Sequence, residues 1–413
     1  MSRRNAVAGV ALAGWLACGF ACAVGADFET ETGWNDQLFP SFIIATATIK
    51  LPDDAIEDRD EDEEVLGDSQ GLLGVTLDAP EDDTAVKVTI SCDAIMEPST
   101  FSGTLAEGGK SYTIFPKIKY KYDVLAKRSQ PGPVTVTYKV ELGDEEAEEQ
   151  TETLTLRSIN DCPFTIVEDE GTVDVCFMFA AYVNEQHPYV DKILREALNT
   201  KIVDSFTGYQ SKDKAEVYRQ VYALWQALSQ RDLRYSDITT SSAESETVSS
   251  QHVRLIDESI NNAQANCVDG SVLFASLLRK VGIEPYLVMV PGHCYLAFAL
   301  DEQGEDVVGL ETTLIGGGAP AKFKEIKGLR KLISKEAAAD PSYATFSAAV
   351  EMGTADLRKN KDKFEADDEP NYLLMPVAAA RKLGILPIAF QANGKFVPAP
   401  TNSGATETSS QDE

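Results

Sequence analysis

The chain has 413 residues, which is enough for two or three domains of ordinary size. Its 66 acidic residues outnumber 37 basic residues and give a formal net charge of −29. A nucleic-acid partner is therefore disfavoured, because binding to phosphates requires a basic surface. The surplus of acidic residues mainly favours solubility.

Residues 1–26 have the character of a secretory signal peptide. A short basic lead ends at Arg4, an apolar run extends from Ala6 to Ala23, and Ala26 is a small residue at the favoured cleavage point. We therefore expect an exported protein, located in the periplasm, at the cell surface or in the medium. An uncleaved membrane anchor is less favoured, and no later stretch is long and apolar enough to span a bilayer.

Cysteine usage fits an exported protein in which at least one thiol stays free or pairs between chains. A lipid anchor at Cys18 or Cys22 is disfavoured, because the residues before them do not form a good lipoprotein box. Removal of the signal leaves an odd number of cysteines in a compartment where disulfides persist. These cysteines are Cys92, Cys162, Cys176, Cys267 and Cys294. The sequence leaves the disulfide partners of the first three open.

The next 130 or so residues divide into an acidic segment and a strand-rich segment. Residues 27–70 include the run Asp53–Glu64, which is too charged to bury, and we expect an acidic linker there. Residues 71–158 alternate between apolar and polar side chains in short runs bounded by turn residues, which predicts half-buried antiparallel strands. The runs begin at Leu73, Val86, Tyr112, Val134 and Thr151. Their number and spacing favour a β-sandwich of immunoglobulin-like size.

Helical patterns follow in the second half of the chain. Apolar residues recur every three or four positions in Val190–Leu198 and Val217–Leu228, as in helices that face a core. Further helical patterns, Thr345–Met352 and Met375–Leu383, predict a helical extension over residues 321–392. Residues 393–413 are polar and of low complexity, and we expect a disordered tail. The predicted fold class is a multidomain α+β protein.

Cys267 is predicted to begin a helix. Asn266 is a suitable N-cap, Asp269 places negative charge in the first turn, and Gly282 suits the left-handed position after the last turn. The position matters chemically, because the positive end of a helix stabilises a thiolate, which is the nucleophilic form of cysteine.

His293 is predicted to open a strand directly after the break at Pro291-Gly292. Alternation places His293 and Tyr295 on one face and Cys294 on the other, so Cys294 is interpreted as a core thiol. A polar turn then leads to Val307–Thr313, which can return antiparallel beside the histidine strand. Glu311 would then lie close enough to His293 to accept a hydrogen bond and orient the imidazole.

These segments resemble the core of the transglutaminase-like superfamily, whose fold is related to that of papain. The resemblance rests on helix-initial Cys267, the Ala275–Pro285 continuation, Gly292-His293 at a strand start, and Leu310–Thr313. It covers about residues 179–318 and implies a transglutaminase-like α+β domain over residues 165–320. By resemblance, Cys267 is the nucleophile, His293 the general base and then acid, and Glu311 the orienting carboxylate.

Two departures from the family pattern bear on the reaction. Crosslinking members usually have tryptophan after the cysteine and aspartate as the third residue, whereas Val268 and Glu311 stand here. This favours hydrolysis of peptide or amide bonds over glutamine-to-lysine crosslinking. For the oxyanion, the backbone N–H of Cys267 is the first candidate donor and Gln264 the second.

The sequence thus predicts an exported thiol-dependent hydrolase or acyltransferase acting through a cysteine thioester. Its partner would be a protein or peptide substrate, with cell-envelope material among the possibilities. No cofactor or metal is expected, since Cys267, His293 and Cys294 lack the short paired spacing of zinc ligands. The alternative is a non-catalytic transglutaminase-like protein with a binding or structural role in the cell envelope.

Overall fold

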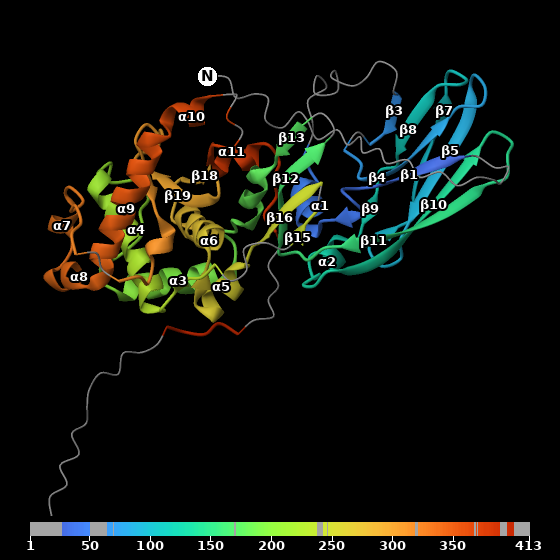
Figure 1. The fold of residues 1–413 in the computed structure, drawn as a ribbon. Coiled ribbons are helices and arrows are strands. Elements are labelled where there is room, and N and C mark those ends of the chain that lie inside the picture. The colour runs from blue at the N-terminus through green and yellow to red at the C-terminus, as the bar shows by residue number, and fades with distance from the viewer. Residues whose placement is uncertain are drawn as a thin grey trace, which may run out of the picture.

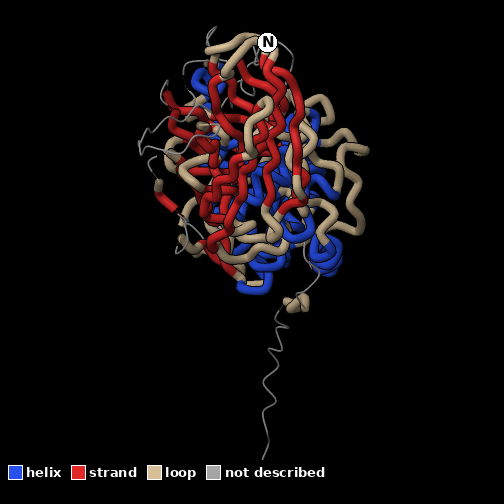
Figure 2. The backbone as a smooth tube through the Cα atoms, turned by 90° about the vertical axis from the view of Figure 1, so that its right-hand side faces the viewer, coloured by secondary structure: helices blue, strands red, loops and turns tan. Residues whose placement is uncertain are grey.

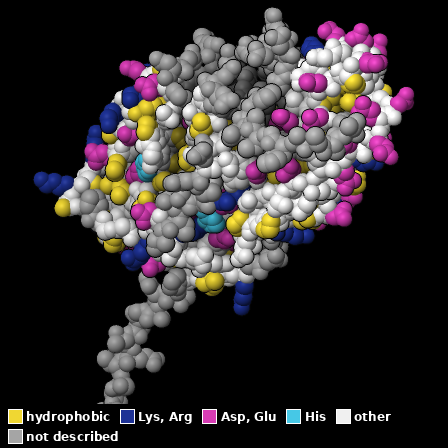
Figure 3. All heavy atoms as spheres, turned by 45° about the vertical axis from the view of Figure 1, so that its right-hand side comes forward, with side chains coloured by type: hydrophobic (Ala, Val, Ile, Leu, Met, Phe, Trp, Pro, Cys, Tyr) yellow, Lys and Arg dark blue, Asp and Glu magenta, His cyan; other side chains and the backbone are white. Residues whose placement is uncertain are grey.

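The computed structural model describes residues 27–49, 64–68, 70–168, 171–237, 243–245, 247–318, 321–366, 369, 371–388 and 395–399. The fold is mixed α+β and compatible with more than one domain. A β-rich part, built from the N-terminal residues, lies beside an α+β part that holds most of the helices (Figure 1). Figure 2, turned toward the β-rich part, shows its strands in front of those helices. Acidic side chains gather over the β-rich part on the face in Figure 3.

Two sheets make up the β-rich part. One has the order β1-β4-β8-β3, with bounds Phe28–Thr32, Leu73–Asp78, Ser111–Phe115 and Glu64–Gly67. The other has the order β2-β11-β10-β5-β7, with bounds Gln37–Leu38, Glu148–Leu156, Gly132–Leu142, Thr84–Ser91 and Ser99–Leu105. The short strands β6 (Met96–Glu97) and β9 (Lys119–Tyr120) pair with each other, and α2 spans Tyr122–Leu125.

Alternation of side chains explains why the five predicted strands form where they do. In β5, buried Val86, Val88 and Ile90 alternate with more exposed residues, which gives the strand one core face and one solvent face. The predicted runs correspond to β4, β5, β8, β10 and β11, so these strands are confirmed.

The prediction of a linker over residues 27–70 is wrong for residues 27–49. Strand β1 pairs with β4, strand β2 pairs with β11, and helix α1 (Pro40–Thr46) is almost wholly buried. The acidic composition of the whole segment obscured the apolar side chains of Trp34, Phe39 and Phe42, which are buried here. Most of the acidic run, the predicted signal peptide and residues 400–413 lie outside the described residues.

The β-rich and α+β parts share one apolar core. Strand β12 (Asp161–Glu168) joins a sheet of order β13-β12-β16-β15, whose other strands are Gly171–Asp174, Val248–His252 and Ala243–Glu244. The second part therefore begins near residue 161 rather than 165. Pro163 lies inside this strand and accompanies a shift in register, as proline inside a sheet usually does.

The candidate site is built around an antiparallel sheet with the order β20-β19-β18-β21. Its strands span Val307–Leu310, His293–Ala299, Pro285–Val290 and Leu373–Pro376. Helix α6 (Cys267–Lys280) packs against β18 and β19, and helix α9 (Pro341–Lys359) packs against β20. The predicted helices near residues 190 and 217 correspond to α3 (Pro188–Asn199) and α4 (Lys214–Gln230).

Three predictions about the C-terminal region need correction. The described residues between 321 and 388 are part of the α+β unit, because β21 is an edge strand of the site sheet and α9 packs on β20 and β19 of that sheet. The predicted helix from Met375 begins as that strand, and α11 spans only Val377–Lys382. The predicted disorder of residues 393–413 is wrong for residues 395–399, which lie against α3 and the end of α4.

The remaining short elements connect these units. They are η2 (Cys176–Tyr182), β14 (Arg234–Tyr235), α5 (Ile256–Asn262), β17 (Gln264–Ala265), η3 (Thr312–Leu314), α7 (Leu329–Leu332), α8 (Lys335–Ala339) and α10 (Lys361–Glu365). Among the described residues, no helix combines the length and apolarity needed to cross a membrane.

Candidate active site

The first turn of α6 is fixed by reciprocal capping. The Asn266 side chain accepts a hydrogen bond from Asp269 N at 2.9 Å, and the Asp269 carboxylate accepts one from Asn266 N at 3.0 Å. Arg254 donates to the same carboxylate from its backbone N at 2.8 Å and from its guanidinium at 2.7 Å. Because Asp269 is wholly buried and its charge is paired, the turn that begins with Cys267 is rigidly held.

Helix α6 begins at Cys267, as predicted, and its first turn packs on η3. Gly270 permits this approach, since a Cβ there would lie 3.1 Å from Thr312 Oγ1. Ser271 reinforces the contact: its hydroxyl donates to the Cys267 carbonyl at 2.7 Å and lies 3.3 Å from Thr312 Oγ1. Cys267 is half-buried rather than enclosed. The contact of α6 with η3 places its turn beside the segment that carries Glu311.

His293 is the first residue of β19, and its predicted orientation is confirmed. Its ring stacks on Tyr295, with centroids 6.0 Å apart, on the face of the sheet that α9 covers. Cys294 points to the opposite face and is buried in the main core, where its sulfur lies 3.9 Å from Met289 Sδ. The imidazole is 34% exposed, so a reacting group can reach it.

Glu311 directly follows β20 and meets His293 as predicted. His293 Nε2 and Glu311 Oε2 are 2.8 Å apart. The other carboxylate oxygen, Oε1, accepts hydrogen bonds from the hydroxyl and backbone N of Thr313 at 2.7 and 3.2 Å. Since Nε2 is engaged by Glu311, Nδ1 is the ring nitrogen left for the thiol.

Helix α9 fixes the backbone around Glu311. Glu311 N donates to the Ala349 carbonyl at 3.0 Å, and Gly309 N donates to Thr354 Oγ1 at 3.1 Å. The helix and strand cross so closely that a Cβ on Gly353 would lie 2.6 Å from Leu310 N. Glycine is thus required at the crossing, and α9 is a structural part of the site.

The pKa values of His293 and Glu311 move in opposite directions. The pKa of His293 is raised to about 10, first by a hydrogen bond with the Cys267 side chain and then by the bond to Glu311, while burial opposes both. Burial alone would raise the pKa of Glu311, but hydrogen bonds from His293 and Thr313 outweigh it and lower that pKa. The site therefore favours a charged imidazolium between sulfur and carboxylate at neutral pH.

Three of the other thiols lie in environments that disfavour charge. Burial raises the pKa of Cys294, Cys162 and Cys176 well above the ordinary thiol value. The structure describes all five cysteines expected after signal removal, and each is a free thiol. Among them, Cys267 combines partial exposure with a histidine partner.

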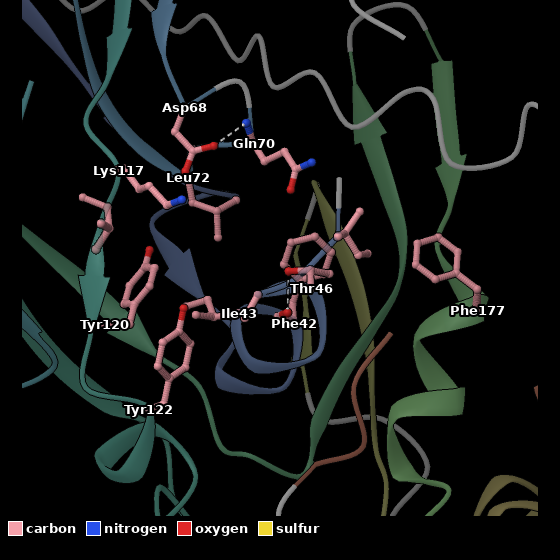
Figure 4. Close-up of a pocket in the computed structure, with 14 residues that line it drawn as sticks. Phe42, Ile43, Thr46, Asp68, Gln70, Leu72, Lys117, Tyr120, Tyr122 and Phe177 are labelled. Atoms are coloured by element: carbon pink, nitrogen blue, oxygen red, sulfur yellow. Dashed lines mark hydrogen bonds between the residues drawn. The ribbon is translucent and has the colours of Figure 1, made fainter. Parts of the chain in front are cut away.

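A cavity of about 340 Å³ adjoins the imidazole on the α9 side. Its lining includes His293, Tyr295 and Glu311 from the sheet, with Met352 and Asp356 from α9. A different hollow of about 140 Å³ lies between α1 and the β-rich part, with Phe42, Tyr120, Tyr122 and Phe177 in its wall (Figure 4). His293 and Glu311 line the first cavity and Cys267 lines neither; because no residue of the triad lines the second hollow, we place the candidate site at the first.

Gln264 is not brought into the triad. It is exposed on β17, and none of the hydrogen bonds within the described part of the chain joins its side chain to Cys267, His293 or Glu311. Strand β17 pairs instead with β14, which carries Tyr235. Tyr235 lies opposite Ala265, two residues before Cys267, and its ring is half-exposed. Burial and then the neighbouring Cys267 raise the pKa of Tyr235.

Several site residues could not be found from sequence. Arg254, Tyr235 and the α9 residues act through contacts between segments that are separated in the chain. Thr313 instead contacts Glu311, two residues before it. One signal in the sequence points toward Arg254. Asp269 caps the first turn of a core-facing helix, so its carboxylate is expected to be buried and to need a cationic partner. The sequence does not say that the partner is Arg254.

Among the described residues, no group of three or more histidine, cysteine and acidic side chains could hold a metal ion. In comparisons with known proteins, no family model matches this sequence and no curated protein resembles it significantly.

Proposed function

We propose that this protein is a thiol-dependent hydrolase or acyltransferase that acts on peptide or amide bonds through a thioester on Cys267. The observation that carries the proposal is the placement of His293 between a half-buried helix-initial thiol and a carboxylate 2.8 Å from its Nε2. A nucleophile, a base and a group that orients the base recur in this arrangement across unrelated enzymes.

The geometry supports a two-step reaction. The sulfur of Cys267 attacks the carbonyl carbon, and protonated His293 gives its proton to the departing amine as the C–N bond breaks. Water or an amine then attacks the thioester; His293 takes its proton, and the C–S bond breaks to restore the thiolate. Glu311 stabilises the imidazolium and fixes the ring, and Thr313 keeps the carboxylate in place.

We further propose that the α+β part is a transglutaminase-like, papain-related unit. Support comes from the order of its functional elements: a helix begun by Cys267, a strand begun by His293, and a hairpin return ending at Glu311. In the same proposal, the β-rich part is an immunoglobulin-like module that presents the site to a protein or cell-envelope substrate outside the cytoplasm. The shared core of the two parts is consistent with a fixed mutual placement.

Turnover assays with paired variants test the function. Peptide libraries and carboxamide substrates, with and without an added primary amine, would be incubated with wild type, Cys267→Ala and the matched control Cys294→Ala, and products would be identified by mass spectrometry. We expect products with wild type and Cys294→Ala and none with Cys267→Ala. Peptide binding without turnover, equal in wild type and Cys267→Ala, would favour the non-catalytic alternative.

A further inference from the structure

Residues 395–399 lie in an aromatic and charged cradle on the α+β part. The ring of Phe396 meets Tyr189 of α3 edge-to-face, with centroids 4.9 Å apart. Lys192 Nζ lies 4.7 Å and the guanidinium carbon of Arg231 lies 4.6 Å from the centroid of the Phe396 ring. Both cations are within the range of cation–π attraction. The cradle therefore recognises an aromatic side chain at this position.

The cradle also forms hydrogen bonds with the backbone of the segment. Val397 N donates to Asn261 Oδ1 of α5 at 3.1 Å, and the Val397 carbonyl accepts a hydrogen bond from Arg231. Ala399 N donates to Glu196 Oε1 at 3.2 Å. Main-chain hydrogen bonds combined with one side-chain pocket are the usual means by which a protein holds an extended peptide.

The cradle is organised by its own contacts. Both oxygens of Glu196 accept from Arg231 Nη1 at 2.7 Å, and the Asn261 amide donates to the Tyr189 hydroxyl at 3.2 Å. Arg231 is only 6% exposed, whereas the Val397 side chain is 52% exposed. The recognising groups are thus preorganised, and the segment presents one side chain inward and the next outward.

Both anchoring elements lead directly to the candidate site. Arg231 ends α4 and is followed by β14, which carries Tyr235 beside Cys267. Asn261 lies in the last turn of α5, and β17 then connects that helix to Asn266 and Cys267. Strands β14 and β17 pair with each other. The segment therefore joins two elements that hold the approach to the nucleophile (Figure 1, red segment beneath α3 and α5).

We propose that this cradle is a sequence-selective site for an extended peptide with a central aromatic residue, and that the chain's own residues 395–399 occupy it as a releasable strap over the elements leading to Cys267. The selectivity lies in the Phe396 pocket and in the backbone contacts at Val397 and Ala399. The exposed Val397 side chain contributes little. The proposal stands on these contacts alone and does not require that the protein turn over a substrate.

Competition between the strap and a free peptide tests the proposal. A fluorescent peptide of residues 393–401 would be titrated, by anisotropy, into full-length wild type, Phe396→Ala and the matched control Val397→Ala. We expect the peptide to bind Phe396→Ala at least about tenfold more tightly than wild type or Val397→Ala, whose own segments occupy the cradle. A peptide carrying the Phe396→Ala change should lose at least about tenfold in affinity for the same protein.

The link to the nucleophile is tested in the same samples. The alkylation rate of Cys267 by iodoacetamide, resolved by peptide mass spectrometry, should change at least about threefold in Phe396→Ala and return toward the wild-type rate when the peptide saturates the cradle. Equal peptide affinity for Phe396→Ala and wild type would overturn the proposal that residues 395–399 occupy the cradle. Peptide binding that leaves the alkylation rate unchanged would overturn its connection to the site.

Discussion

The two faces of the site sheet place side chains of the same strand, β19, in different surroundings. On the α6 side, Cys294, Leu296 and Phe298 of β19 are buried in the main core. On the α9 side, His293 and Tyr295 border a cavity of about 340 Å³. Consecutive residues thus place one thiol in hydrocarbon and one imidazole beside open space, because side chains alternate along a strand.

This difference shows why reactivity depends on position more than on residue type. Burial raises the pKa of Cys294 and makes it inert, whereas Cys267 occupies a half-buried helix start beside His293. The three groups of the proposed triad all lie where an element begins or ends: Cys267 at the start of α6, His293 at the start of β19 and Glu311 just after β20.

Replacement of the two thiols should give the largest contrast. Cys267→Ala should abolish turnover, because Cys267 is the described thiol that has His293 as its hydrogen-bond partner. Cys294→Ala should keep turnover and lower the free energy of unfolding by about 1 kcal/mol, since it removes a buried side chain. Initial rates and urea unfolding measure the two quantities. Full turnover in Cys267→Ala would show that Cys267 is not the nucleophile.

Loss of the orienting carboxylate should have the next largest effect. Glu311→Gln keeps the volume but removes the charge that stabilises the imidazolium, so the turnover rate should fall about 10²- to 10⁴-fold. Asp301→Asn, in the turn before β20 and remote from the triad, is the matched control and should keep the wild-type rate. A Glu311→Gln enzyme with wild-type turnover would show that His293 needs no orienting group.

A substitution at Gly353, where α9 crosses β20, tests whether α9 belongs to the site. Gly353→Ala would gain about 1 kcal/mol of helix propensity, but its Cβ would lie 2.6 Å from backbone Leu310 N. The clash is with backbone atoms, which cannot rotate away as a side chain can. We therefore expect the free energy of unfolding to fall by about 1–3 kcal/mol, and turnover to fall as Glu311 shifts. Gly318→Ala, where nothing lies within 4 Å, should change neither the free energy of unfolding nor turnover. Unchanged turnover in Gly353→Ala would make α9 a covering element only.

The raised pKa of His293 predicts a pH effect of known sign. Because its folded pKa is about 10 and its ordinary value is 6.5, the stabilisation is complete below pH 6.5 and is lost as pH rises toward 10. The difference in free energy of unfolding between wild type and His293→Gln should shrink across that range. NMR titration should show the His293 pKa falling in Cys267→Ala and, by less, in Glu311→Gln. A His293 pKa near 6.5 in wild type would contradict the predicted contacts.

Local patterns predicted the central elements well, because each depends on neighbouring residues. Asn266 and Asp269 mark a helix start, and alternation after Gly292 separates His293 from Cys294. The start of that strand and the hairpin return were enough to bring Glu311 to His293.

The sequence-based predictions that were wrong have a common physical cause. Whether Trp34 and Phe42 are buried depends on strands far along the chain, so composition alone misassigned residues 27–49 as linker. The role of α9 depends on the fit of Gly353 against Gly309, which no periodicity encodes. Residues 395–399 looked disordered because their partners, such as Tyr189 and Arg231, belong to other elements.

The most direct test of the triad is the alkylation rate of Cys267 at pH 7, resolved by mass spectrometry, in wild type and His293→Gln. We predict that Cys267 in wild type reacts at least about tenfold faster than the same cysteine in urea-unfolded protein, and that His293→Gln removes this advantage. A Cys267 that reacts no faster when folded, or whose rate is unaffected by the loss of His293, would contradict the account.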